Sequence, residues 1–256
     1  MNARMKKTAV LAIAALMVTV SSVPADEVAE LGRRICRQYG DAVITVKMVT
    51  RSRTVYSGRQ SGNDESKSQL MGVIIDSLGS AIVSLSETDP SSRWYFDDEE
   101  SGDFKVENEI TDIKMLMPGG EEISARALLR DKDLDLVFIR PVKKQQRKFT
   151  CIDFAKKDSL ALFDQVIFLG RMGKIAGRIV SVSVSRVQGI IEKPRVLYIP
   201  DELASINGLG RPAFALSGKP VGILLVRTMA SRGFENSAIP IILPAEEIVE
   251  AMEQMQ

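Results

Sequence analysis

About a dozen short apolar segments separated by turn signals run along the chain, and this succession restricts the possible folds more than any other feature. Pro118-Gly119-Gly120, for example, separates two such segments and predicts a hairpin. The expected strands cover residues 42–50, 71–76, 80–85, 113–117, 122–129, 134–139, 165–169, 177–187, 196–199, 213–216, 221–227 and 237–242. Short strands at such spacing are typical of antiparallel barrels or sandwiches. The sequence therefore predicts an all-β fold.

Two amphipathic segments bracket these strands. Val28, Leu31, Ile35 and Tyr39 recur at helical spacing and predict a helix over residues 27–39. Residues 244–255 begin with proline and two glutamates, which favour a helix start, and carry apolar side chains on one face. We therefore expect a short helix at each end of the β-structure.

Two polar segments lack any period and are predicted to be loops. The first is Arg51 to Ser68, and the second, Thr88 to Asn108, contains Trp94, Tyr95 and Phe96 beside an acidic run. Aromatic side chains with acidic flanks are common at protein interfaces, which makes these three aromatics candidate binding residues, although most such loops are only solvated. The acidic run lacks the ligand spacing of a calcium loop, and we predict no metal site and no cofactor.

The first 25 residues have the pattern of an export signal. A basic start, Met1 to Lys7, precedes an apolar run, Thr8 to Val20, and Val23 and Ala25 suit a signal peptidase site. The run is shorter than the roughly 20 residues that span a bilayer, so we predict a signal peptide at 1–25 and a periplasmic or secreted protein with no further membrane span. An uncleaved N-terminal anchor is the alternative.

Export would permit a disulfide between the two cysteines of the chain, Cys36 and Cys151. The sequence does not show that they are close in space. Free cysteines are also common as small buried apolar side chains. Both alternatives therefore stay open at this point.

The chain contains no histidine, and this excludes several mechanisms. Histidine is the usual base at neutral pH, so neither a Ser-His-Asp triad nor a Cys-His dyad can form. The net charge of the chain does not indicate a binding partner, because without residues 1–25 the chain has 31 basic and 33 acidic side chains. Such a balance supports neither nucleic-acid binding nor binding to an anionic membrane.

Several segments resemble, in order, the trypsin-like proteases of the HtrA (Deg) type. They include Gly72–Leu85, Arg130–Ile139, Gly177–Ser181 and Asp201–Pro212, the last at the place of the nucleophile loop. The resemblance implies two six-stranded antiparallel β-barrels with the active site between them. We expect one domain over 26–256 and, because the sequence ends right after the expected terminal helix, no PDZ domain of the kind that HtrA proteins carry. The expected parts of the domain over 26–256 are a first barrel at about 42–140, a linker at 141–149, a second barrel at about 150–242 and a C-terminal helix at 244–255.

Matched position by position, the resemblance implies a degenerate active site. The histidine position falls on Ser86, the aspartate on Asp135 and the nucleophile on Leu209. Asn207, Gly208, Leu209 and Gly210 match the oxyanion loop, and Arg211 replaces a glycine beside it. Leucine cannot attack a carbonyl and serine is no base at pH 7, so this pattern predicts a pseudo-protease. Asp135 would then accept hydrogen bonds within the fold or pair with Arg211.

The sequence thus favours an exported, non-catalytic scaffold that binds a protein or peptide through the old cleft or the loop at 88–108. One alternative is a divergent hydrolase, for which Ser217 and Lys219 form the visible dyad. Another is an inactive subunit that modulates an active HtrA-type protease. Such proteins commonly form trimers through their N-terminal region, which here corresponds to Glu27–Tyr39.

Overall fold

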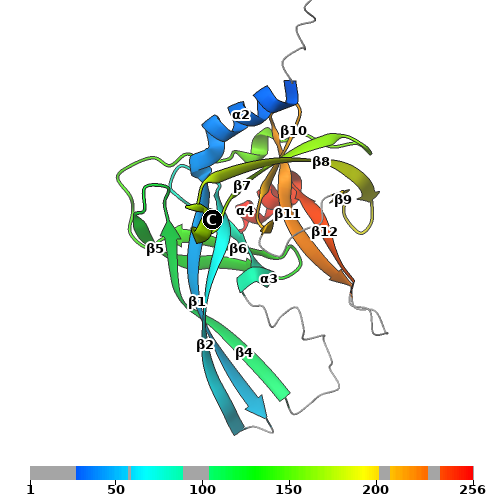
Figure 1. Ribbon diagram of the computed structural model, residues 1–256. Coiled ribbons are helices and arrows are strands. Elements are labelled where there is room, and N and C mark those ends of the chain that lie inside the picture. Colours follow the sequence, from blue (N-terminus) through cyan, green and yellow to red (C-terminus); the bar gives the residue numbers. More distant parts are fainter. Residues whose placement is uncertain (1–26, 57–58, 89–103, 202–207, 230–236, 256) are drawn as a thin grey trace, which may run out of the picture.

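The structure is a computed structural model that describes residues 27–56, 59–88, 104–201, 208–229 and 237–255, and it contains two closed β-barrels (Figure 1). The first has the strand order β1-β2-β3-β6-β5-β4, and all its neighbours are antiparallel. Its strands are β1 (Val43–Tyr56), β2 (Arg59–Ile74), β3 (Ala81–Ser84), β4 (Phe104–Leu116), β5 (Glu122–Asp131) and β6 (Leu136–Pro141).

The second barrel has the order β10-β11-β12-β9-β8-β7, also antiparallel throughout. Its strands are β7 (Gln165–Arg171), β8 (Val180–Ile191), β9 (Leu197–Pro200), β10 (Pro212–Ala215), β11 (Pro220–Met229) and β12 (Ser237–Pro244). The prediction of two six-stranded antiparallel barrels is therefore confirmed.

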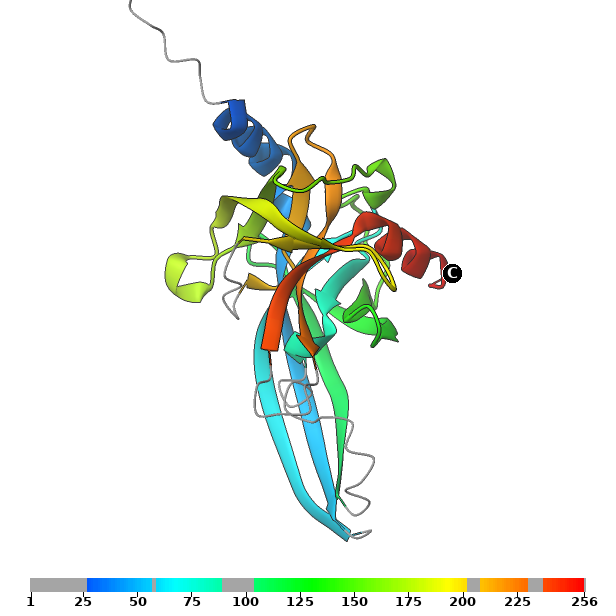
Figure 2. The same cartoon turned by 90° about the vertical axis from the view of Figure 1, so that its right-hand side faces the viewer.

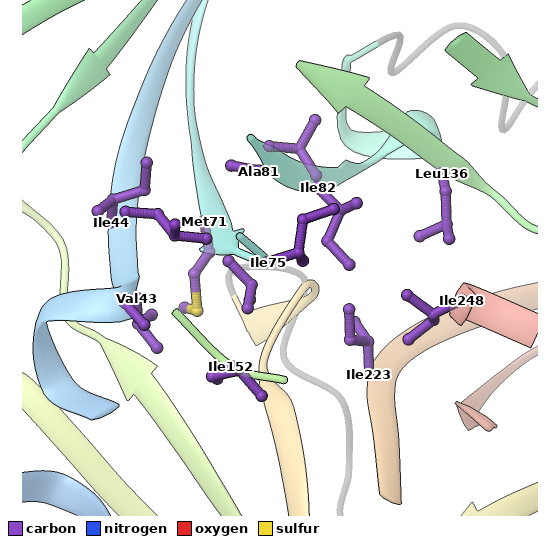
Figure 3. Close-up of a cluster of buried hydrophobic side chains, with 14 of the residues drawn as sticks. Val43, Ile44, Met71, Ile75, Ala81, Ile82, Leu136, Ile152, Ile223 and Ile248 are labelled. Atoms are coloured by element: carbon purple, nitrogen blue, oxygen red, sulfur yellow. The ribbon is translucent and has the colours of Figure 1, made fainter. Parts of the chain in front are cut away.

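The core between the barrels explains why several strands of the second barrel are apolar on both faces. In β7, Val166 and Phe168 belong to the cluster inside the second barrel, whereas Ile167 and Leu169 belong to the cluster shared with the first. Figure 3 shows part of this shared cluster, with Ile223 of β11 near side chains of the first barrel. Such double burial favours continuous apolar runs over simple alternation.

Arg171, at the end of β7, joins the second barrel to the start of the first. Its guanidinium donates hydrogen bonds to the carbonyls of Val43, Gly40 and Arg178. Burial lowers the pKa of Arg171 from its ordinary value. The bonds to Gly40 and Val43 link the two barrels, and the bond to Arg178 holds the guanidinium in place from its own barrel.

The predicted loop at 51–68 is wrong, because these residues continue β1 and β2 as a long hairpin. Together with β4 they form a three-stranded ribbon that projects away from the barrels (Figures 1 and 2). On the central strand Arg51 lies opposite Glu65 of β2 and Glu109 of β4. Backbone pairing and opposite charges on neighbouring strands stabilise such a ribbon, whereas residues 51–68 have no apolar period from which the sequence could have predicted it.

Helices lie at both ends of the described chain, as predicted. The first, α2 (Glu27–Tyr39), buries Leu31 and Ile35, and Tyr39 stacks on Phe214 with ring centroids 5.3 Å apart. The last, α4 (Ala245–Glu253), contacts β11 and buries Ile248 and Ala251. A one-turn helix, α3 (Leu85–Thr88), follows β3. No helix within the described ranges is long and apolar enough to cross a membrane.

Three sequence predictions concern residues outside the described ranges: the export signal at 1–25, the aromatic triplet Trp94-Tyr95-Phe96, and Asn207 of the nucleophile loop. The structure does describe both cysteines. Cys36 and Cys151 are free thiols, and each is half-buried. The structure therefore has no disulfide between these two residues. Burial raises the pKa of Cys151, and the nearby Asp76 and Asp153 add to the increase.

Candidate functional site

Asp135 occupies the last position of the turn between β5 and β6. The side chain of Asp131 accepts a hydrogen bond of 2.9 Å from the amide of Leu134 and closes this turn. Asp135 itself has φ +59°, a left-handed conformation that aspartate adopts more readily than most residues. Its backbone carbonyl accepts from the amide of Leu85 at 2.9 Å. The turn is therefore tied to the end of β3, and the carboxylate faces the residues that follow that strand.

Two serines and one amide surround the Asp135 carboxylate. The Ser86 amide donates to Oδ1 at 2.6 Å, and the hydroxyls of Ser84 and Ser86 donate to Oδ2 at 2.9 and 3.0 Å. The two hydroxyl oxygens lie 3.0 Å apart, and Ser84 is fully buried. The structure thus brings together the positions that match the histidine and aspartate of the family. Ser84 is an additional member of this group that sequence reasoning missed.

The position that matches the nucleophile carries a buried side chain. Leu209 is only 1% exposed. The next residue, Gly210, has φ +80° and donates its amide hydrogen to the Leu224 carbonyl at 2.8 Å. A Cβ on Gly210 would lie 3.0 Å from the carbonyl oxygen of Met71, in β2 of the first barrel. The loop therefore turns directly against the first barrel, where only glycine combines this conformation with this approach.

Arg211 lies along its own barrel. Its Nε donates to the Gly208 carbonyl at 2.9 Å, its Nη1 donates to the Ser183 hydroxyl at 3.2 Å, and its guanidinium carbon lies 5.2 Å from the centre of the Phe168 ring. Gly170 of β7 provides the space, because a Cβ there would lie 3.0 Å from Cδ of Arg211. The arginine thus holds the nucleophile loop against β7 and β8.

The alternative Ser-Lys pair lies on a turn. The Ser217 hydroxyl donates to the Asp158 carboxylate at 2.6 Å, and the Lys219 side chain is exposed. This hydrogen bond lowers the pKa of Asp158, with help from the amide of Ser159. The Ser217 hydroxyl is thus bonded to a carboxylate rather than to the Lys219 amine, so these residues do not form an activated nucleophile.

A second hydrogen-bonded aspartate, Asp201, directly follows β9. The Asp201 carboxylate accepts hydrogen bonds from the Ser185 hydroxyl and the Arg186 amide, at 2.5 and 2.8 Å. These bonds lower the pKa of Asp201, the hydroxyl contributing most. The serines of β8 that make these contacts with Asp201 and Arg211 were not singled out from the sequence, although their alternation with valine was visible there.

Two closed six-stranded antiparallel barrels, with a turn aspartate beside the end of β3 and a glycine loop between the barrels, define the trypsin-like protease fold. Comparisons with known proteins agree. The chain is homologous to a probable periplasmic serine endoprotease, DegP-like, of Rhizobium meliloti (strain 1021), at 30% identity over 133 residues, or 51% of the chain. It spans only about a quarter of that relative, 26% of its length.

Among solved structures, the chain is similar to the MamO protease domain from Magnetospirillum magneticum in its apo form. The TM-score is 0.51 at 18% identity, and the match covers 84% of this chain and 97% of that domain. At this identity the likeness supports the fold alone. No protein-family model matches the chain.

Proposed function

We propose that the protein is an exported pseudo-protease that binds a protein or peptide without cleaving it. The observation that carries this proposal is the pairing of Asp135 with Ser84 and Ser86 in a chain without histidine, together with the buried Leu209 at the matched nucleophile position. A hydroxyl cannot accept the proton of a nucleophile at pH 7, and leucine has no lone pair with which to attack.

The retained framework supports a binding role rather than a mere remnant. Arg171 of the second barrel bonds the backbone carbonyls of Gly40 and Val43 at the start of the first, and Gly210 lets the nucleophile loop approach Met71. A protease fold that keeps the contact between its barrels keeps the place where the resemblance puts substrate peptides. The periplasmic relative supports export, with residues 1–25 as the proposed signal.

The catalytic part is tested with purified protein, fluorescein-labelled casein and a fluorescent serine-directed phosphonate. We expect an increase in casein anisotropy as protein is added, intact casein on gels, and no phosphonate label. Casein cleavage that the phosphonate abolishes would instead establish the divergent hydrolase.

The binding surface is identified by comparing two arginine variants and one deletion. Arg211→Ala removes the side chain that holds the nucleophile loop. Arg147→Ala removes an arginine of the linker, which forms an ion pair with Glu121. Weaker casein binding is expected for Arg211→Ala if casein binds in the old cleft, and for the deletion of 89–103 if it binds to that segment. Binding by Arg147→Ala should be unchanged. A mass measurement in solution, with and without an active HtrA-type protease, tests the alternative role as a modulating subunit.

A further inference from the structure

The two faces of the β7–β8 hairpin meet different parts of the molecule. On β8, Val182 faces helix α2, because a Cβ on Gly32 of that helix would lie 3.3 Å from it. The next residue, Ser183, points to the opposite face and accepts a hydrogen bond from Arg211. Gly170 of β7 shares this second face, since a Cβ there would lie 3.0 Å from Arg211. We call this side of the hairpin the serine face; it comprises Gly170, Ser181 and Ser183, and the nucleophile loop lies along it.

An exposed apolar pair lies at the end of the serine face. The Met172 amide donates a hydrogen bond of 2.9 Å to the Ile179 carbonyl, two positions beyond the pairing of Gly170 with Ser181. Side chains two positions apart on a strand share a face, so Met172 and Ile179 belong to the serine face. They are exposed by 47% and 60%, at the base of the yellow-green turn that projects from the side of the molecule in Figure 2. The apolar pair therefore follows Arg211 along the hairpin.

Arg178, next to this pair in the chain, reaches the first barrel. Its carbonyl accepts a hydrogen bond from Arg171 at 2.8 Å, and its Nη2 donates to Oε1 of Gln69 at 3.1 Å. Gln69 lies on β2, two residues before Met71, the residue that the nucleophile loop approaches at Gly210. Arg178 is thus held beside the place where the nucleophile loop meets the first barrel.

The guanidinium of Arg178 has no compensating carboxylate within the described ranges. None of the ion pairs found there includes Arg178. Its Nε is also the single buried side-chain nitrogen or oxygen of the described residues that has no hydrogen-bond partner. A planar guanidinium with unused donors matches a carboxylate, which can accept two parallel hydrogen bonds. An acidic side chain is therefore the group that this position favours.

We propose that the partner is recognised here, through a peptide segment that places an acidic side chain on Arg178 and a neighbouring aliphatic side chain on Met172 and Ile179. This inference rests on the proposed function, because it specifies the chemistry of the segment that binds in the old cleft. Charge complementarity selects the acidic residue, and burial of the exposed apolar pair selects the aliphatic one. A peptide that offers only one of the two groups should bind more weakly.

The experiment measures the anisotropy of fluorescein-labelled peptides as the full chain is added. The first peptide has the central sequence leucine-aspartate-leucine between flanks of glycine and serine. A second peptide has asparagine in place of the aspartate, and a third has serine in place of both leucines. We expect the first peptide to bind about tenfold more tightly than either of the others.

Three variants assign the binding to this surface. Arg178→Gln should weaken binding of the aspartate peptide about tenfold and leave binding of the asparagine peptide unchanged, because the lost bond is the one to the carboxylate. Ile179→Ser should weaken binding of the aspartate peptide about fivefold. The matched control is Val184→Ser, since Val184 is also exposed, by 49%, but lines a groove with α2 on the other face of β8. Its binding should equal that of the wild type.

Equal losses of affinity for the aspartate and asparagine peptides in Arg178→Gln would overturn the inference, as would equal losses in Ile179→Ser and Val184→Ser. If casein binds but the aspartate peptide does not, this inference fails and the proposed function stands; if neither binds, both fail. A dimer in solution that Arg178→Gln converts to a monomer would place a second copy on this surface and would equally overturn the inference.

Discussion

The two barrels differ at the positions that the resemblance matches to the catalytic residues of a protease. In the first, Ser86, matched to the histidine, is a polar residue that donates hydrogen bonds to Asp135. In the second, Leu209, matched to the nucleophile, is an apolar residue whose side chain is buried.

This difference indicates how strongly the stability of the fold depends on each of the two side chains. The carboxylate of Asp135 needs donors, and serine hydroxyls supply them where an imidazole would have. At Leu209 the packing itself depends on the new side chain. Reversal at Ser86 would therefore cost little stability, whereas reversal at Leu209 would remove part of the apolar interior.

The largest expected effect is that of Leu209→Ala. Truncating a buried leucine should lower the free energy of unfolding by about 2–5 kcal/mol, because transfer energy is lost and a cavity remains. Urea denaturation measures it. Leu162→Ala is the control, since that side chain is 63% exposed and its loss should change stability by at most about 0.5 kcal/mol. Equal effects at the two positions would contradict the structural role given to Leu209.

Asp135→Asn should lower the free energy of unfolding by a smaller amount. Asp135→Asn leaves the buried Ser84 hydroxyl and the Ser86 amide without a carboxylate, which should cost about 1–3 kcal/mol. Combining it with Ser86→Ala tests whether the residues act as one unit: the double variant should lose at least about 0.5 kcal/mol less than the two single losses together. Additive losses would mean that Ser86 and Asp135 stabilise the fold independently.

The smallest effect concerns the exposed aspartate of the second barrel. Ser185→Ala removes the main cause of the lowered pKa of Asp201, so that pKa should rise toward its ordinary value in an NMR titration. In the wild type, the stabilisation from Asp201 is present above its unfolded pKa and is lost as pH falls through the folded one. The variant should therefore be less stable than the wild type at neutral pH, and the gap should close in acid. An unchanged pKa would show that the Arg186 amide alone holds the carboxylate.

Local signals predicted much of the fold. The turn at Pro118-Gly119-Gly120 and the apolar spacing of α2 were readable from the sequence because short-range conformational preference decides them. The ribbon at 51–68 was not, because its strands are stabilised by pairing with β4 rather than by any apolar period of their own.

Part of the candidate site was also predictable. The resemblance assigned Ser86 and Asp135 to matching positions, and the structure brings them into hydrogen-bond contact. It did not reveal Ser84, nor that Arg211 would lie along β8. A hydroxyl becomes a partner only when strands distant in sequence meet, so no local pattern signals it.

By itself, the sequence determined the class of fold and the absence of histidine, since turn residues, strand periods and the lack of a side-chain type can be read along the chain without its tertiary structure. Only the tertiary structure decided which way β8 faces and that Leu209 is buried. A strand that alternates valine and serine can turn either face to the core. Its partners on both sides decide which face meets water.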